Sequence, residues 1–144
     1  MIRQQFVIPG YDWLVNVWYH VDDYYTDEIL EAMERMGCPE SELQRAYENL
    51  SSEQVNKGLC YSNYRSRESV MVISDTSSPE EFANSYDHEK RHLERHIEEA
   101  FGIAPYGEEA AYLAGNIGQA MFRKAKLFMC ECHGIYRGRK PAND

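Results

Sequence analysis

The sequence predicts an α+β fold, a small domain with a short mixed or antiparallel sheet and a pair of long helices. The first half of the chain contains runs of aromatic and β-branched residues, such as residues 13–19, which are typical of strands. The second half contains a long segment, residues 80–101, without Pro or Gly, which is typical of a helix. At 144 residues, the chain is long enough for one core and fits a single domain.

Before the long helix, short strands and helices alternate, and Gly, Pro or polar residues separate them. Pro9 and Gly10 suit a turn between the first two strands, and Gly37 suits the end of the first helix. The polar residues 65–68 suit the turn of a hairpin. The expected elements are strands at 6–8 and 13–19, helices at 26–36 and 39–50, and hairpin strands at 59–64 and 69–74.

The long helix is expected to cover residues 79–101. Ser78 suits the N-cap and Pro79 the first helical position. Glu81, three residues after Ser78, is placed to complete a capping box. Gly102 suits its C-terminal cap. At 100° per residue, the apolar face contains Phe82, Tyr86, Leu93, Ile97 and Ala100, and the solvent face contains Arg91, Glu94, Arg95 and Glu98.

This helix carries an H-E-x-x-H string at residues 88–92. Residues four apart on a helix lie one above the other, so His88 and His92 point the same way and can bind one zinc ion. Glu89 lies beside them, in a position to move protons. The pattern predicts a metal site that serves hydrolysis, and the alternative is a solvated helix face rich in His, Glu and Arg.

A second helix is expected to begin at Glu108, after the turn residues 102–107. If this helix packs antiparallel to the first, either Glu108 or Glu109 could supply the third ligand that a catalytic zinc site needs. Glu108 is preferred because it shares a face with small residues that allow close packing, and Glu109 remains the alternative. The small-residue face contains Ala111, Gly115, Gly118 and Phe122, and an adjoining apolar stripe contains Ala110, Ala114, Ile117, Met121 and Phe128.

Together, the H-E-x-x-H string and the following E-x-x-A-Y-L string at 108–113 resemble the zincin metallopeptidases of gluzincin type. In particular, they resemble small zinc peptidases encoded by phages and mobile elements. The resemblance covers about residues 69–122. It implies a zincin-like domain, one zinc ion on His88, His92 and Glu108, and Glu89 as general base and acid. The chain departs from the pattern in having charged Lys90 and Arg91 between the histidines, and it has no evident specificity domain.

Hydrolysis of a peptide or amide bond by such a site also needs a donor that stabilises the oxyanion. The candidates are Tyr106, Tyr112, His96 and His133, and the sequence does not choose among them. For His96, a partly buried helix histidine bonded to a neighbour is the favoured interpretation. The expected partner is a peptide or protein substrate; the alternative function is a non-catalytic, zincin-derived module that binds a protein and keeps zinc or the helix pair for structure.

The remaining features concern the partners, the location and the domain organisation of the protein. The net charge of −9 argues against a nucleic-acid partner, and the basic stretch at 123–140 reads as a solvated helix end and tail. No long apolar run or signal-like start is present, so we expect a cytoplasmic protein without a membrane segment. The expected organisation is one domain over 1–144, with a strand and helix region at 1–75, the metal-site helix pair at 76–130 and a tail at 131–144.

The four cysteines are too few for a disulfide framework, so reduced thiols are expected. A second metal site at Cys130, Cys132 and His133, completed by Cys38 or Cys60, is an open alternative, although the paired C-x₂-C spacing of structural zinc sites is absent.

Overall fold

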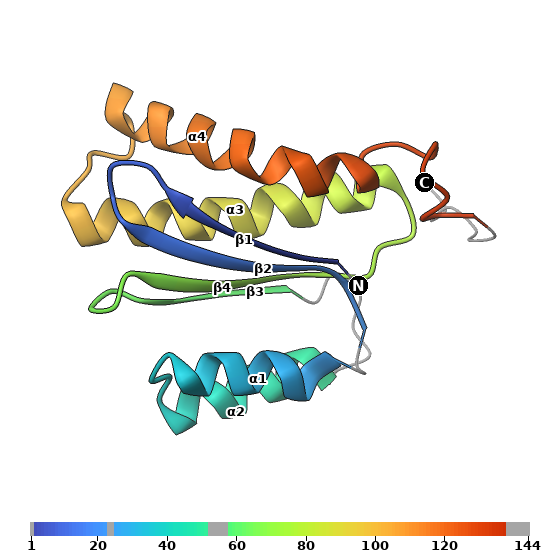
Figure 1. Cartoon of the computed structure of the whole chain (residues 1–144), viewed down its shortest axis with the longest axis horizontal. Helices are drawn as coiled ribbons and strands as arrows, with labels where there is room; N and C mark the ends of the chain where they lie inside the picture. The colour runs from blue at the N-terminus through green and yellow to red at the C-terminus, as the bar shows by residue number, and fades with distance from the viewer. Residues whose placement is uncertain (1, 23–24, 52–57, 138–144) are drawn as a thin grey trace.

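A four-stranded mixed sheet lies between two layers of helices (Figure 1). The computed structural model describes residues 2–22, 25–51 and 58–137. Within these residues the elements are β1 (Ile2–Ile8), β2 (Trp13–Val21), α1 (Thr26–Arg35), α2 (Glu40–Ser51), β3 (Gly58–Asn63), β4 (Glu68–Ser74), α3 (Pro79–Phe101), α4 (Glu108–Ala125) and the 3₁₀ turn η2 (Lys126–Phe128). The predicted α+β class is confirmed.

The strand order is β1-β2-β4-β3. The two hairpins, β1–β2 and β3–β4, are antiparallel, and they join through the parallel pair β2–β4 in the middle of the sheet. Consequently β1 and β3 are the edge strands, which the sequence alone did not reveal.

The two faces of the sheet carry separate cores. Successive side chains of β4 point to opposite faces, so Val70 and Val72 pack with α1 and α2, while Met71 and Ile73 pack with α3 and α4. This explains why β4 is apolar throughout rather than alternating. Figure 1 shows α1 and α2 on one face and α3 and α4 on the other.

Helix α3 begins and ends as the sequence predicts. The Ser78 hydroxyl accepts a hydrogen bond from the Glu81 N–H at 3.2 Å, and Gly102 closes the helix in the left-handed conformation with φ 67°. The predicted capping box differs in its second bond: the Glu81 carboxylate accepts from the backbone N–H and the hydroxyl of Ser77 rather than from the Ser78 N–H, and these bonds lower its pKa. The cap therefore fixes where α3 starts.

The solvent face predicted for α3 is wrong for two residues. Glu94 and Glu98 are buried, with 6% and 2% of their surface exposed. Each accepts hydrogen bonds from cationic side chains of the same helix, Lys90, Arg91 and Arg95. These bonds compensate the cost of burying the two carboxylates.

The predicted apolar stripe of α4 does pack inward at Ala110, Ile117 and Met121, whereas the small-residue face predicted to contact α3 is largely exposed. Its buried residues are Ala110, Leu113, Ile117, Met121 and Ala125. Ala111, Gly115 and Phe122, which share a face with Glu108, are exposed. The larger apolar stripe buries more apolar surface than the small-residue face, and it determines how α4 is rotated.

The segment after α4 folds back onto the core. Phe128 is fully buried, and the Tyr136 hydroxyl donates a 2.6 Å hydrogen bond to the Phe128 carbonyl. Cys130 and Cys132 form a disulfide, so the expectation of reduced thiols is wrong for this pair, whereas Cys38 and Cys60 are free. The predicted tail beyond residue 137 lies outside the described residues. Among the helices described, none has the length and apolar character needed to span a membrane.

Candidate functional site

The H-E-x-x-H string lies in the middle of α3, where His88 and His92 occupy successive turns of the same face. Their Nε2 atoms lie 3.2 Å apart, and their rings meet edge to face with centroids 4.8 Å apart. Burial, and to a lesser degree the neighbouring His88, lower the pKa of His92. Both effects favour the neutral imidazole that a metal ligand requires.

The separation of the two nitrogens fits a shared zinc ion. With a Zn–N distance of about 2.05 Å and tetrahedral angles, two ligand nitrogens lie about 3.3 Å apart. The same distance also suits a direct hydrogen bond between two neutral imidazoles. The pair is therefore preorganised for a metal, and it has a partner when no metal is bound.

The Glu89 side chain is directed toward the sheet, where its Oε1 faces Gly58 of β3. Only 6% of its surface is exposed, and burial raises its pKa to about 7. Its Oε1 lies 4.0 Å from His88 Nε2, and its Oε2 has no hydrogen-bond partner in the described part of the chain. A buried carboxyl with a pKa raised to about 7, beside the His88 imidazole, is suited to moving protons.

Strand β3 makes the wall against which Glu89 packs. Gly58 is needed there because a Cβ at this position would lie 2.7 Å from Glu89 Oε1 and 3.0 Å from the Val72 carbonyl oxygen. Cys60 on the same strand is also close enough that the Glu89 charge contributes to its raised pKa, although burial is the larger cause.

Lys90 and Arg91, the two cations between the histidines, bind carboxylates of the same helix. Lys90 Nζ donates to Glu94 at 2.6 Å, and Arg91 donates to Glu94 at 3.0 Å and to Glu98 at 3.1 Å. The departure from the usual H-E-x-x-H composition thus has a structural explanation, because these cations neutralise the buried carboxylates of α3.

The structure does not bring Glu108 to the histidines. Among the described His, Cys, Asp and Glu residues, no third group lies within 4.8 Å of both imidazoles. A Cβ at Gly118 would lie 3.3 Å from Lys90 Cε, so the middle of α4 is level with the motif. Glu108 lies about 15 Å further along the helix axis, at 1.5 Å per residue. The predicted set of three ligands is therefore not assembled.

The alternative ligand, Glu109, is engaged elsewhere. It accepts a 3.1 Å hydrogen bond from the Tyr11 hydroxyl, in the turn between β1 and β2. Figure 1 shows that the turn of the β1–β2 hairpin and the connection from α3 to α4 lie at the same end of the molecule. The first turn of α4 caps this end and does not fold over His88 and His92.

His96 has the structural role that the sequence favoured. Its Nδ1 lies 2.7 Å from the Ser62 hydroxyl, which lies 2.6 Å from the Ser69 hydroxyl, and Ser69 accepts a 2.7 Å hydrogen bond from Trp13. Burial, followed by the neighbouring His92, lowers its pKa. Nothing in the sequence signalled this chain of polar contacts, because its members come from four separate elements.

The predicted oxyanion donors lie on other parts of the surface. Tyr106 is 92% exposed in the loop after α3, and Tyr112 is 70% exposed on α4. His133 lies beyond α4, next to Cys130 and Cys132. None of these three has a described contact with the histidine pair.

The site opens onto solvent beside an edge strand. A hollow of about 460 Å³ is lined by the two histidines together with Asn84, Asp87 and Arg91. Helix α3 contacts β3 and β4, and Glu89 and His96 both touch β3. Around the helix axis, His88 and His92 lie next to His96 and Glu89, on the side turned away from α4. The pair therefore lies on the β3 side of α3, closer to solvent than Glu89 and His96.

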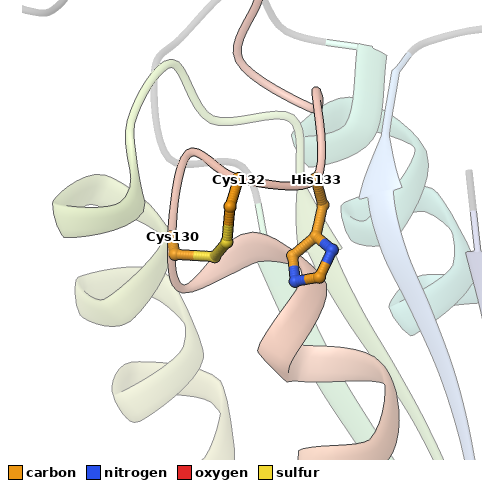
Figure 2. A group of neighbouring side chains, drawn as sticks. All are labelled: Cys130, Cys132 and His133. Carbon is orange, nitrogen blue, oxygen red and sulfur yellow. A yellow bond between two sulfur atoms is a disulfide. The ribbon is translucent and has the colours of Figure 1, made fainter.

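The structure also brings together a second group, Cys130, Cys132 and His133, whose ligand atoms all lie within 4.8 Å of one another (Figure 2). This cluster could hold a metal ion. Cys38 and Cys60, the sequence's candidates for its fourth ligand, do not join it.

Comparisons of this chain with protein-family models, with curated proteins and with solved structures found no match.

Proposed function

We propose that this protein is a zinc-dependent hydrolase of a peptide or related amide bond, in which His88 and His92 bind the metal and Glu89 carries the proton. The observation that supports it most directly is the 3.2 Å distance between the two Nε2 atoms. Two imidazoles held this way on one helix match the spacing of ligands around one zinc ion.

The residues divide the chemistry between them. Zinc, when bound, supplies an activated water and polarises a carbonyl oxygen. Glu89 Oε2, which is buried and unpaired among the described residues, is free to accept a proton and return it to the leaving amine. A carboxyl with a pKa of about 7 can do both near neutral pH.

The surroundings favour an extended substrate. Among the described residues, β3 pairs as a strand with β4 alone, so its other edge is where a peptide would add as a further strand. The hollow beside the histidines is open to solvent and is lined by polar and charged residues, which suits a chain that passes across the surface rather than a small enclosed ligand.

One observation favours a second function, a protein-binding module that does not catalyse hydrolysis. Helix α4 supplies no third ligand, so only two protein ligands are described for the metal. A two-ligand site binds zinc more weakly than a three-ligand site, and such a module would use the edge of β3 and the helix pair for binding alone.

The metal ligands are tested by calorimetric titration with Zn²⁺. The experiment uses a Cys130→Ser/Cys132→Ser background, so that thiolates at that cluster cannot contribute. We expect one zinc ion per chain, loss of binding in His88→Ala/His92→Ala, and unchanged affinity in Glu108→Gln, because Glu108 lies far along α4. Weaker zinc binding in Glu108→Gln than in Glu109→Gln would restore Glu108 as a ligand. If the background protein itself binds no zinc, the hydrolase proposal fails and the protein-binding module is the remaining function.

Catalysis is tested with a mixture of internally quenched peptides. Glu89→Gln should keep its zinc and lose hydrolysis by roughly a hundredfold or more, the usual contribution of a general base. Hydrolysis that survives in Glu89→Gln would contradict the assigned role. Loss of zinc in this variant would instead make Glu89 a ligand.

A further inference from the structure

We propose that Cys130, Cys132 and His133 form a second metal site, which binds Zn²⁺ through two thiolates and one imidazole when the cysteines are reduced, and which is closed when they form a disulfide. This site shares no residue with the His88–His92 pair, so it stands or falls independently of the proposed hydrolase.

The ligand atoms are already close together. The two sulfur atoms and a ring nitrogen of His133 lie within 4.8 Å of one another, and Figure 2 shows the imidazole beside the two cysteines. Two thiolates and one imidazole are a donor set that favours zinc, a borderline-soft ion, over the hard ions Mg²⁺ and Ca²⁺. The thiolate charges also balance that of Zn²⁺.

The loop that carries these ligands is anchored at both ends. On one side Phe128 is fully buried and stacks on Tyr19 and Phe82. On the other side Tyr136 is buried, and its hydroxyl donates a 2.6 Å hydrogen bond to the Phe128 carbonyl. Gly134, with φ 76°, permits the reversal between them. The cluster is therefore a closed loop on the core and not a free tail.

The disulfide contributes little to holding this loop. It joins residues two apart in the sequence, and a cross-link constrains the unfolded chain less as the closed loop becomes shorter. The hydrogen bond between Tyr136 and Phe128 joins residues on either side of the disulfide, so it closes the loop without it. Its removal is thus compatible with the folded structure.

The surface position makes the disulfide accessible to a reductant. Cys132 and His133 are exposed and Cys130 is half-buried. Reduction by a thiol reductant takes two electrons and two protons and yields two thiols. Metal binding then releases the two thiol protons and forms two sulfur–metal bonds and one nitrogen–metal bond, and a water molecule can take the fourth position.

The test uses Co²⁺ as a spectroscopic probe, with the full-length protein either reduced and freed of reductant or left oxidised. A thiolate bound to Co²⁺ gives a charge-transfer band in the near ultraviolet, which imidazole ligands do not give. We expect this band in the reduced protein, its absence in the oxidised protein, and its displacement when Zn²⁺ is added.

Variants assign the band to residues. Cys130→Ser/Cys132→Ser, which keeps Cys38 and Cys60, should abolish it, and His133→Ala should weaken Co²⁺ binding by at least about tenfold, because even an outer-shell partner contributes that much. His88→Ala/His92→Ala is the matched control and should keep the band. Because Cys132, His133, His88 and His92 are exposed and Cys130 is only half-buried, we expect all three variants to fold, as checked by circular dichroism.

Two results would overturn the proposal. One is reduced protein, shown by thiol titration to carry free Cys130 and Cys132, that gives no thiolate band at saturating Co²⁺. The other is a band of undiminished strength in Cys130→Ser/Cys132→Ser, which would place the thiolate ligand at Cys38 or Cys60. If a variant does not fold, alkylation of the exposed Cys132 in the reduced native protein gives the same discrimination, and it should remove the band.

Discussion

At the scale of single residues, Glu89 shows a conflict between stability and the candidate site. Its burial destabilises the fold, but the same burial suits the carboxyl for proton transfer. A carboxyl with 6% of its surface exposed and one oxygen without a partner among the described residues is costly to bury in its charged form. Burial accordingly raises its pKa to about 7 from the ordinary value of 4.5. The folded protein holds a proton there that the unfolded chain loses at lower pH.

This difference predicts a pH dependence of stability. Between about pH 4.5 and pH 7 the unfolded chain is ionised at Glu89 while the folded protein is protonated, so stability falls as pH rises through this window. In the presence of a chelator, Glu89→Gln should therefore be more stable than the unchanged protein at pH ~8 by about 1 to 3 kcal/mol, with a much smaller difference at pH ~4. Urea unfolding at both pH values measures this, and an equal difference at both would count against a raised pKa.

Gly58 gives a second prediction, because it faces the same carboxylate. The Cβ of Gly58→Ala would meet a carboxylate oxygen and the Val72 backbone, so we expect a loss of about 1 to 3 kcal/mol in unfolding free energy. Gly115→Ala is the matched control: no atom lies within 4 Å of its Cβ, and the exposed helical site should gain up to about 1 kcal/mol. Both values come from denaturant unfolding, and a neutral Gly58→Ala would mean that β3 moves easily.

Residue-level predictions from the sequence succeed where a local rule fixes the geometry. His88 and His92 are one helical turn apart, so helix formation alone brings them together. The third ligand depended on how α4 is rotated and placed against α3, and the sequence offered two faces for that contact. The bond between His96 and Ser62 links residues on α3 and β3, and no local pattern encodes it.

At the scale of elements, α3 shows how strongly local signals can define a helix. Ser78→Ala removes the hydroxyl that accepts from the Glu81 N–H, and we expect the unfolding free energy to fall by about 0.5 to 2 kcal/mol. Ser66→Ala is the control, since Ser66 lies in an exposed turn and bonds Asn63 through its backbone N–H. Thermal unfolding followed by circular dichroism compares the two, and equal midpoints would show that the Glu81–Ser77 contacts suffice as a cap.

The helix and strand types predicted from the sequence agree with the structure from β1 to α4, with ends displaced by a few residues. The predicted first strand, residues 6–8, is shorter than the observed β1, Ile2–Ile8, because Arg3, Gln4 and Gln5 are polar and did not suggest a strand. They nonetheless pair with β2, and Gln4 bonds the Ala120 carbonyl of α4. Partners from distant segments thus determine the length of an edge strand more than its own composition does.

At the scale of the whole molecule, two cores share the central strands β2 and β4. Trp13 belongs to the core under α3 and α4, and Trp18, further along the same strand, belongs to the core under α1 and α2. Neither helical layer can leave without exposing a face of the same sheet. The fold should therefore unfold as one cooperative unit.

The two tryptophans make this testable. In Trp13→Phe the fluorescence reports the α1–α2 side, and in Trp18→Phe it reports the α3–α4 side. We expect the fluorescence transition in urea to coincide with the circular dichroism transition in each variant. An earlier fluorescence transition in Trp13→Phe alone would indicate that the α1–α2 layer melts separately.

The parallel pairing of β2 with β4 has a consequence for how quickly the chain reaches its native state. Leu14 pairs with Glu68 and Trp18 with Val72, so the centre of the sheet forms only after a long intervening stretch has closed into a loop. The two hairpins and the α3–α4 pair need only nearby residues and can form early. We therefore expect a chain with this topology to fold in milliseconds to seconds rather than microseconds, with the joining of the two hairpins as the slow step.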